Sequence, residues 1–289
     1  MKKALKQTDN MKYIFNYIFL LFFVLSGCTH KNDNKQGNTA GLKIVSLAAS
    51  ISDELVELGL KHNIVGATSY CKIAKDNKDL IVGSALETNE EKIILLKPHI
   101  VCATRLTKQS TIDILKKNGI NVFVYNKANS FKSIANNFVN LGKKTGKEDK
   151  AKAIVKKAQT KIDSLTELIS KQNKMPKILF QLGSNPIATV IPDTYMDELI
   201  RLSGGINLFY DMNKYIVSRE SVLLRNPDFI FITTMGTSGD DERKTWQQYK
   251  DISAVKNNKI FLIDAGTASL PTVTNFVNTL EFMIKKMYF

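Results

Sequence analysis

The sequence predicts an α/β protein of two lobes, each built on a mostly parallel β-sheet, that are bridged by one long, rigid helix. Three observations lead to this prediction. Short β-branched runs alternate with helical patterns in both halves of the chain. An amphipathic stretch without glycine or proline separates the halves. The length of 289 residues also exceeds what one hydrophobic core usually organises.

The first half contains four short apolar runs with the composition of buried strands: Lys43–Leu47, Ile64–Thr68, His99–Ala103 and Ile120–Tyr125. Helical patterns follow them at Ser52–Leu60, Asn89–Lys97, Ser110–Asn118 and Phe131–Leu141, and Gly142 is expected to end the last of these. This alternation with short loops is typical of βαβ units, so we predict a Rossmann-like lobe.

The second half repeats the alternation. Strands are expected at Lys177–Gln181, Ile187–Ile191, Phe229–Thr233 and Lys259–Ile263. Helices are expected near Tyr195–Leu202, Ser221–Arg225, Thr245–Val255 and Asn275–Met287. A second Rossmann-like lobe follows from this pattern.

The stretch between the halves, from Lys147 to about Asn173, carries apolar residues three or four positions apart. That spacing describes one stripe along a helix of about 27 residues, hence about 40 Å long. No glycine or proline interrupts it before Pro176, so the helix should be stiff. A coiled-coil dimer would look similar, but the pattern covers under four heptads and both flanks are globular. We therefore predict a helix laid across the two lobes.

The N-terminus predicts export. Lys12 precedes an apolar run at residues 13–25, which is short for a membrane-spanning helix and suits a cleaved signal peptide. Residues 25–28 resemble a bacterial lipobox, in which Cys28 would receive the lipid. An uncleaved anchor helix with an incidental cysteine is the alternative, and Met11 could be the true start.

These features divide the chain into five expected segments. They are a lipoprotein signal peptide (1–27), a flexible tether (28–42), an N-terminal lobe (43–145), the connecting helix (146–174) and a C-terminal lobe (175–289). We expect an exported, periplasmic protein that is anchored to a membrane through Cys28.

The formal net charge of +14 could attract nucleic acid, anionic lipid or an anionic ligand. The lysines are scattered along helical stretches, without an arginine-rich run or a basic motif interleaved with aromatic residues. Nucleic-acid binding is therefore not predicted. We interpret most of the charge as solvated helix faces.

Two cysteines remain once Cys28 is assigned to lipid. Cys71 and Cys102 each end an apolar run, so they could form one disulfide or stay as buried thiols. The three histidines, His30, His62 and His99, form no cluster with zinc spacing. We expect no metal site of the protein's own.

The sequence lacks the patterns of several enzyme classes. Residues 182–186 lack the second glycine of a nucleophile elbow, and there is neither a phosphate-binding loop nor a glycine-rich dinucleotide fingerprint. The acidic groups at residues 53–54 and 240–242 are interpreted as helix-start or loop charges. We predict a protein that is not an enzyme and holds no cofactor.

Ligands of open α/β sheets bind beyond the carboxyl ends of parallel strands. Candidate residues at these ends are Tyr70, Arg105, Asn185 and Thr267. Tyr70 could stack on a planar ligand or ligate iron, or could be loop packing, and Arg105 could pair with ligand carboxylates or form a surface salt bridge. Tyr215 and Trp246 are weaker candidates because either could belong to the core.

Each half also contains a short helix that begins with acidic residues. Glu91 and Glu220 are each followed seven residues later by a proline and then by an apolar strand, which suggests a duplicated unit. Thr88 should form a capping box with Glu91, and Ser218 should cap the helix that carries Glu220. The helix dipole alone would explain acidic residues at both positions.

Several segments resemble class III periplasmic solute-binding proteins, which serve ABC importers of vitamin B12, ferric siderophores and haem. The resemblance covers essentially the whole chain after the tether. It is carried by residues 44–50, 59–60, 64–71, 82–83, 89–93, 96–98, 185–186, 198–200, 204–207 and 217–220.

The resemblance implies two lobes bridged by a rigid helix, with a ligand cleft between them and only small opening motions. It also implies that one glutamate per lobe, here Glu91 and Glu220, docks on arginines of the permease. The expected partners are a permease dimer with its ATPase and a bulky metal-chelate ligand, and the protein is expected to be a monomer.

The possible ligands are ranked by the positions at which this chain differs from the residues usual in each kind of binder. Vitamin B12 binders commonly line the cleft with several tryptophans, whereas this chain has only Trp246 and carries Thr104 where an aromatic residue often stands. Haem binders commonly carry a tyrosine where Ser84 stands. Arg105 and the basic balance favour an anionic ferric chelate, followed by a corrinoid and then haem. A surface receptor for haem or corrinoid, or a chelatase-like enzyme on a similar scaffold, are the alternatives.

Overall fold

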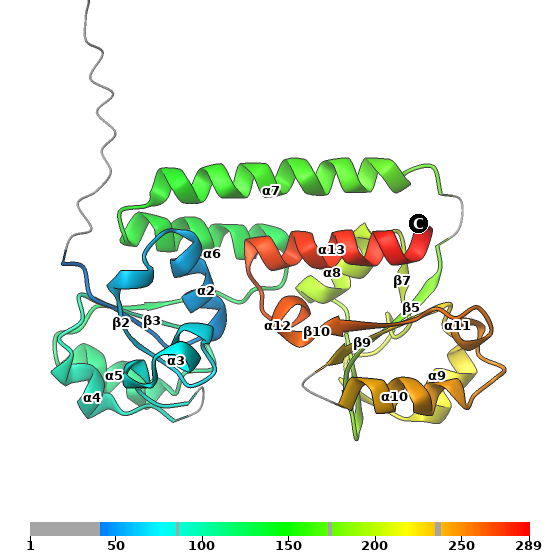
Figure 1. Cartoon of the computed structure of the whole chain (residues 1–289), viewed down its shortest axis with the longest axis horizontal. Coiled ribbons are helices and arrows are strands. Elements are labelled where there is room, and N and C mark those ends of the chain that lie inside the picture. The colour runs from blue at the N-terminus through cyan, green and yellow to red at the C-terminus, as the bar shows by residue number, and fades with distance from the viewer. Residues whose placement is uncertain (1–40, 85–86, 173–174, 235–237) are drawn as a thin grey trace, which may run out of the picture. The chain divides into compact units, whose positions relative to one another are not determined.

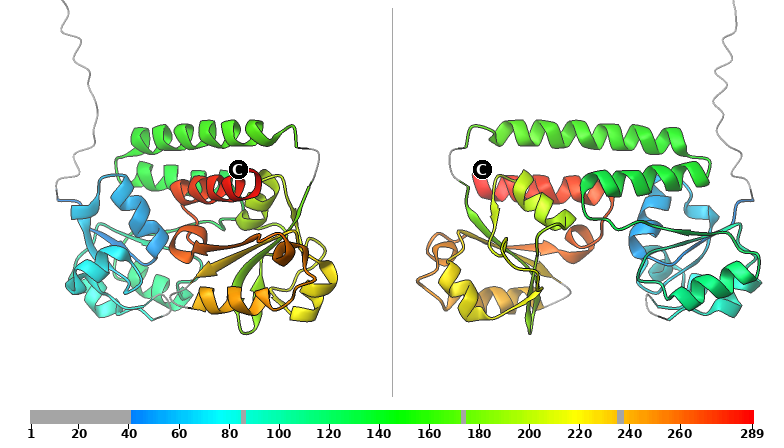
Figure 2. Two further views of the ribbon diagram at one scale, coloured as in Figure 1. Left: turned by 45° about the vertical axis from the view of Figure 1, so that its right-hand side comes forward. Right: turned by 180° about the vertical axis from the view of Figure 1, so that it is seen from behind.

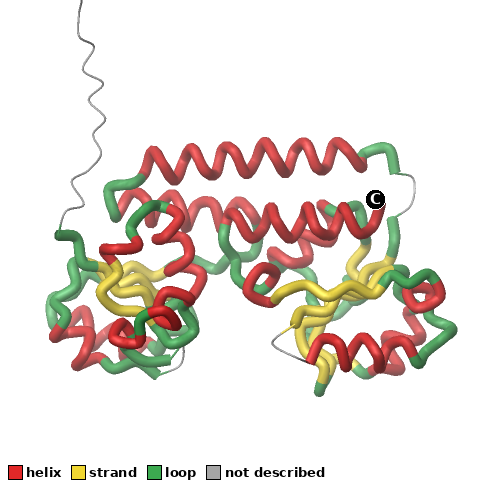
Figure 3. Tube along the Cα trace, viewed as in Figure 1, coloured by secondary structure: helices red, strands yellow, loops and turns green. Residues whose placement is uncertain are grey.

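A computed structural model describes residues 41–84, 87–172, 175–234 and 238–289, and these belong to one compact unit (Figures 1 and 3). The expected signal peptide, Cys28 and nearly all of the expected tether lie outside the described residues. Within the described ranges, no helix combines the length and the apolar character needed to cross a bilayer. Two β-sheets organise this part of the chain.

The N-terminal sheet has four parallel strands in the order β2-β1-β3-β4. The strands are β1 (Ile44–Ser46), β2 (Ile64–Ala67), β3 (Ile100–Ala103) and β4 (Val122–Val124). Each lies within its predicted run. The central strands β1 and β3 are buried along their whole length, which explains why they read as continuous apolar runs.

The C-terminal sheet has the order β10-β9-β5-β6-β8, and β7 also pairs with β5. Its strands are β5 (Lys177–Ser184), β6 (Ile187–Thr189), β7 (Ile206–Asn207), β8 (Ile216–Val217), β9 (Phe229–Thr234) and β10 (Ile260–Asp264). Strands β10, β9, β5 and β7 are parallel, whereas β6 and β8 form antiparallel pairs. The predicted α/β class with mostly parallel sheets is therefore confirmed, and β7 and β8 were not predicted.

The helices and 3-10 turns of the N-terminal lobe are α2 (Ala49–Glu57), η1 (Lys61–Asn63), α3 (Lys72–Asp76), η2 (Lys78–Leu80), α4 (Glu90–Leu95), α5 (Gln109–Lys117) and α6 (Phe131–Lys144). In the C-terminal lobe they are α8 (Tyr195–Leu202), α9 (Arg219–Arg225), α10 (Ser238–Gln247), α11 (Ser253–Lys256), α12 (Ala265–Ala268) and α13 (Val273–Tyr288). Helix α8 has the predicted bounds, and its N-cap Thr194 accepts a hydrogen bond from the Asp197 amide.

One predicted helix, Thr245–Val255, is wrong. The chain forms α10 and α11 there, with turns at residues 248–252 between them. Trp246 and Ile252 are both buried in the same apolar cluster. A turn can place both side chains in that cluster just as one continuous helix can. The spacing of apolar residues therefore did not distinguish a single helix from two helices joined by turns.

The connecting helix α7 spans Glu148–Ile169, which is 22 residues and about 33 Å. It is shorter than predicted, because its C-cap Ser170 precedes the expected end. Its buried stripe is Ala151, Ala158, Ile162, Leu165 and Ile169. These residues share one apolar cluster with residues of both lobes, such as Phe138 and Phe180.

Helix α7 is not a lone rod. Helices α6 and α13 run beside it in all three views, so three helices back the two sheets (Figures 1 and 2). Phe131 of α6 and Phe276 of α13 pack with ring centroids 5.1 Å apart. Lys161 of α7 forms an ion pair of 2.7 Å with Glu281 of α13. The helix that links the lobes is therefore braced by one helix from each.

Gly142 does not end α6, which corrects the prediction. The helix continues to Lys144, and Gly146 supplies the left-handed turn with φ of 71°. A Cβ atom at Gly142 would lie 2.7 Å from the Cβ of Ala151 in α7. The glycine is needed for the close approach of α6 and α7 rather than for a helix end.

Candidate functional site

A cavity of about 820 Å³ opens at the carboxyl ends of the four N-terminal strands. The loop after β1, the loop after β2, the loop after β3 and the loop after β4 each contribute to its wall. The lining residues from this lobe are Leu47, Ala48, Ala49, Ser50, Thr68, Tyr70, Thr104, Arg105, Leu106, Tyr125, Asn126, Lys127, Ala128 and Asn137. Its position and size are those of a ligand site in an open α/β sheet.

The C-terminal lobe contributes a short segment, residues 269–271, between α12 and α13. The cavity therefore lies between chain segments that are far apart in the sequence. Leu270 and Pro271 add apolar surface to the cavity wall.

Two of the five predicted ligand residues, Tyr70 and Arg105, line this cavity. Asn185, Tyr215 and Thr267 do not belong to its wall. Asn185 precedes the cis proline of the β5–β6 hairpin, Tyr215 is 51% exposed just before β8, and Thr267 in α12 donates a hydrogen bond to Asp264. The structure thus brings together only the candidates of the N-terminal lobe.

The charge of the cavity wall is positive. Arg105 and Lys127 are both exposed, and neither forms an ion pair with any described residue. No aspartate or glutamate is among the lining residues of this cavity. Two cations without an ion pair among the described residues, in a wall whose lining residues include no carboxylate, favour an anionic ligand.

The aromatic and apolar groups of the wall are accessible. Tyr70 is 66% exposed and Leu106 is 75% exposed. The Thr104 hydroxyl accepts a hydrogen bond from the Leu106 amide at 3.3 Å, which shapes the turn that presents Arg105. A bulky ligand could therefore contact ring and methyl surface next to the Arg105 guanidinium.

Polar side chains hold the loop after β4. Asn137 of α6 accepts a hydrogen bond from the Asn126 amide at 3.1 Å and donates one to the Asn126 carbonyl at 3.0 Å. Asn137 is almost fully buried and Asn126 is exposed, so both bonds are partly shielded from water. The adjacent Lys127 is thereby presented from a fixed backbone.

Beneath the cavity lies a buried acid. Tyr125 donates a hydrogen bond of 2.6 Å to Glu54 Oε2, and Glu54 is fully buried in α2. Burial raises the pKa of Glu54 to about 8, and the Tyr125 hydroxyl partly offsets this effect. Burial also raises the pKa of Tyr125 well above its usual value, so this residue presents a neutral phenol to the cavity.

Sequence reasoning missed Lys127, Asn126 and Asn137. The strand before them was predicted, so applying the same strand-end rule to β4 would have found the first two. Asn137 lies inside a helix, and only its tertiary hydrogen bonds to Asn126 reveal its role. The segment 269–271 carried no signal in the sequence.

Trp246 is a core residue and not a ligand residue. It is fully buried, and its indole donates a hydrogen bond of 2.8 Å to Gln181. Arg219 lies over its ring at 4.3 Å and forms an ion pair of 2.9 Å with Glu242. This network joins α9 and α10 to β5.

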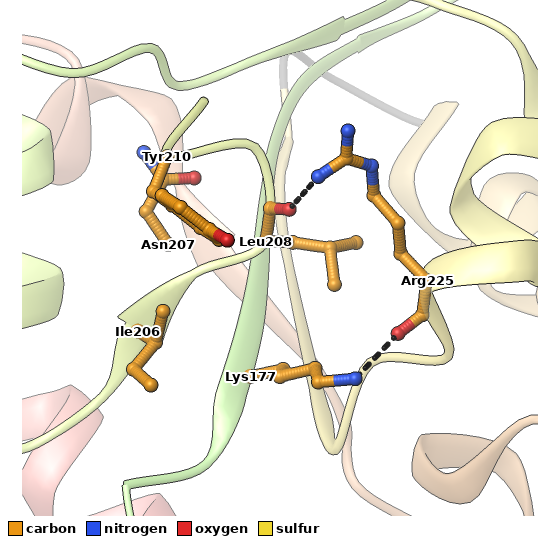
Figure 4. Close-up of a pocket in the computed structure, with 6 residues that line it drawn as sticks. All are labelled: Lys177, Ile206, Asn207, Leu208, Tyr210 and Arg225. Carbon is orange, nitrogen blue, oxygen red and sulfur yellow. Dashed lines mark hydrogen bonds between the residues drawn. The ribbon is translucent and has the colours of Figure 1, made fainter. Parts of the chain in front are cut away.

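A second hollow, of about 500 Å³, lies on the C-terminal lobe (Figure 4). Its two cations are already engaged: Arg225 donates to the Leu208 carbonyl and the Asp211 carboxylate, and Lys177 donates to the Arg225 carbonyl. This hollow therefore lacks the free cations of the larger cavity, which remains the candidate ligand site.

The described residues contain no cluster of three or more His, Cys, Asp and Glu side chains suited to a metal ion. Cys71 and Cys102 are both free and buried, which resolves the two possibilities left by the sequence. Burial raises the pKa of the Cys102 thiol to about 12, so it is an inert core thiol.

The two acidic helices α4 and α9 both exist, and Glu91 and Glu220 lie exposed in their first turns. The predicted capping box of Thr88 is wrong. The N-cap of α4 is Asn89, which accepts from the Lys92 amide, while Thr88 donates to Glu90. The predicted cap of α9 is confirmed, because Ser218 accepts from the Ser221 amide.

Relatives of the chain include transport proteins. It is 29% identical over 232 residues, covering 77% of this chain and 72% of the relative, to the uncharacterized ABC transporter substrate-binding lipoprotein YvrC of Bacillus subtilis. It is 28% identical over 200 residues to the vitamin B12-binding protein of Photorhabdus laumondii, covering 67% and 71%. It is 25% identical over 263 residues to the high-affinity heme uptake system protein IsdE of Staphylococcus aureus, covering 86% and 89%.

Among solved structures, a possible iron-binding periplasmic solute-binding protein from Staphylococcus epidermidis is similar, with a TM-score of 0.73 and 27% identity. The match covers 86% of this chain and 98% of that chain. The predicted resemblance to class III solute-binding proteins is thereby confirmed. A model of the family described as periplasmic binding protein matches residues 44–267, and the chain belongs to this family.

Proposed function

We propose that this protein is the ligand-binding lipoprotein of an ABC importer and captures a siderophore-type ferric chelate or a corrinoid. The main support for this proposal is the cavity, whose wall contains two cations without an ion pair to a described residue, Arg105 and Lys127, and no carboxylate. An anionic ferric chelate matches this charge, so it is the first candidate and a corrinoid is the second. The volume of about 820 Å³ suits a bulky ligand.

Several further features belong to this proposal. The protein acts as a carrier and not as an enzyme, and it works with a permease dimer and its ATPase. It is exported and is anchored by lipid on Cys28. The relatives that carry names of transport function, including a lipoprotein, support these assignments.

Removal of both cavity cations should weaken binding of an anionic chelate. We expect the Arg105→Ala/Lys127→Ala double variant to bind ferric citrate about tenfold more weakly, because two charge pairs in a partly exposed site are each worth up to about 1 kcal/mol. Binding of cyanocobalamin, which has no net charge, should change little. Isothermal titration calorimetry with both ligands measures the two affinities.

The control for this experiment is Lys156→Ala, which removes an exposed lysine of α7 outside the cavity wall. It should keep wild-type affinity. Added salt should weaken binding of the ferric chelate by the wild type more than by the double variant. Equal losses for both ligands in the double variant would contradict the anionic-chelate proposal.

Haem is the third candidate ligand, after a ferric chelate and a corrinoid. A haem carries two carboxylates and a flat apolar ring, and the exposed Tyr70 ring and Arg105 belong to the same cavity wall. The 25% identity to IsdE over most of the chain points in the same direction. A Soret band whose position shifts in Tyr70→Phe would identify this tyrosine as an iron ligand.

Glu91 and Glu220 are proposed to dock the protein on the permease. We expect Glu91→Ala/Glu220→Ala to keep ligand affinity, since neither residue lines the cavity, but to lose most uptake in cells because charges of opposite sign steer and orient docking. Uptake of radiolabelled ligand measures the effect. Glu167→Ala, which removes an exposed carboxylate of α7, should transport normally, and normal transport by the double variant would refute the assignment.

A further inference from the structure

Helices α4 and α9 repeat one pattern on the two lobes. Each has a glutamate in its first turn. Counted from that glutamate, an aliphatic residue follows two positions later, a leucine four, a residue with left-handed backbone six and a proline seven positions later. The first copy consists of Glu91, Ile93, Leu95, Lys97 and Pro98, and the second of Glu220, Val222, Leu224, Asn226 and Pro227.

The two copies are buried and exposed alike. Ile93 and Val222 are fully buried, whereas Leu95 is 80% exposed and Leu224 is 87% exposed. Residues four apart on a helix lie on the same face one turn apart, so each leucine neighbours the glutamate of its own helix. A single exposed leucine is ordinary, but the same exposed leucine beside the same acid on both lobes is not explained by chance exposure.

A left-handed residue also lies at the same distance after both glutamates, although α4 is capped by Leu96 and α9 by Asn226. Lys97 has φ of 47° and Asn226 has φ of 49°, and both lie in the left-handed region that favours glycine. The side chain of Asn226 accepts a hydrogen bond from the Ser253 amide, which holds the end of α9. The chain therefore leaves both helices through a left-handed residue that lies two positions after the exposed leucine.

The cations next to the two glutamates are engaged inside the protein. Lys92 donates to the backbone carbonyls of Asp79 and Ile81, and Arg219 pairs with Glu242. Neither Glu91 nor Glu220 forms an ion pair within the described part of the chain. Both carboxylates therefore remain available to a cation of an external partner.

Both helices lie on the side of their lobe that faces away from α7 (Figures 1 and 2). The three helices α6, α7 and α13 cover the opposite side. A partner that approaches from the α4 and α9 side would thus meet one copy of the pattern on each lobe.

We propose that Leu95 and Leu224 complete two matching docking patches, each made of one exposed leucine and the glutamate four residues before it. This inference rests on the proposed function, because the occupant is the permease dimer. Each permease subunit would present an arginine or lysine to the carboxylate and, one helical turn away, an apolar hollow to the leucine. Two related patches on one chain suit two related subunits.

The two residue types would act differently. The carboxylates accelerate and orient encounter, and their contribution falls with salt. The leucines lose water on docking, so their contribution mainly slows dissociation and depends little on salt. Replacement of either leucine by asparagine should weaken docking about tenfold, which corresponds to about 1.4 kcal/mol, and replacement of both should weaken it about a hundredfold.

The test uses the full chain in detergent micelles and, in nanodiscs, the permease–ATPase complex with which the wild-type protein supports uptake. Dissociation constants are measured at low and high salt for Leu95→Asn, Leu224→Asn, the double variant and Glu91→Ala/Glu220→Ala. Leu168→Asn is the matched control, because Leu168 is 57% exposed on α7, away from both patches. Unchanged unfolding midpoints establish that the variants remain folded.

Three outcomes are distinct. The inference is supported if both leucine variants dock more weakly at low salt and also at high salt, while Leu168→Asn docks like the wild type. Wild-type affinity of the leucine variants combined with loss in the glutamate variant overturns the role of the leucines but leaves the proposed function standing. Failure of the wild-type protein to support uptake through any permease–ATPase complex overturns both.

Discussion

Replacement of Arg219 by methionine is expected to lower the free energy of unfolding by about 3–5 kcal/mol. Arg219 is the first residue of α9, and its guanidinium pairs with Glu242 of α10 at 2.9 Å. The side chain of Glu242 is only 6% exposed. Without the arginine, a buried carboxylate keeps its desolvation cost but loses the cation that offsets it.

The neighbours of this pair make the loss larger. Gln181 donates to the same Glu242 oxygen at 2.9 Å and accepts from the Trp246 indole at 2.8 Å. The Arg219 guanidinium also lies 4.3 Å from the centre of the Trp246 ring. One substitution therefore removes an ion pair, a cation–π contact and the support of a buried hydrogen-bond chain.

Urea unfolding followed by the fluorescence of the chain's single tryptophan measures the effect. Arg219→Met/Glu242→Gln should recover much of the stability, because the neutral amide no longer requires a cation. Arg243→Met removes an exposed pair with Asp240 and should cost less than about 1 kcal/mol. Equal stabilities of Arg219→Met and Arg243→Met would contradict this interpretation.

The second large effect concerns pH and Glu54. Burial is the main cause that raises the pKa of Glu54 from its ordinary 4.5 to about 8, and the nearby Glu57 and Asp53 charges act in the same direction. Between these two values the folded protein holds a proton that the unfolded chain has released. The contribution of Glu54 to stability is therefore complete below pH 4.5 and is lost as the pH rises towards 8.

Glu54→Gln should remove this dependence. The amide stays neutral at every pH and can still accept the hydrogen bond from Tyr125. The variant should match the wild type near pH 4.5 and exceed it at pH 8–9 by several kcal/mol, since each pH unit of the window is worth about 1.4 kcal/mol. Denaturant unfolding across this pH range gives the difference.

Two further variants test whether the pH dependence comes from Glu54 itself. Glu57→Gln, on the same helix but only partly buried, should keep most of the wild-type slope with pH. Tyr125→Phe removes the hydrogen bond that lowers the pKa of Glu54, so it should destabilise the protein most at alkaline pH. A wild-type slope in Glu54→Gln would show that Glu54 is ionised in the folded state at neutral pH.

Only part of the candidate site could be predicted from the strand ends in the sequence. Tyr70 and Arg105 were found because they directly follow predicted parallel strands, and the carboxyl ends of such strands share one edge of a sheet. Asn185 and Thr267 also follow strands, but of the other lobe, whose strand ends do not line this cavity. Which strand ends face a common cavity is a property of how the two sheets are placed.

The sequence by itself determined the α/β class, nearly all strands and the apolar stripe of α7. These features depend on the order of apolar and polar residues within short segments of the chain. It also determined the repeated acidic helices. Only the tertiary structure decided that Gly142 packs against Ala151, that Trp246 is buried and that Glu54 lies under Tyr125. These facts depend on contacts between residues far apart in the chain, and such contacts leave no local pattern.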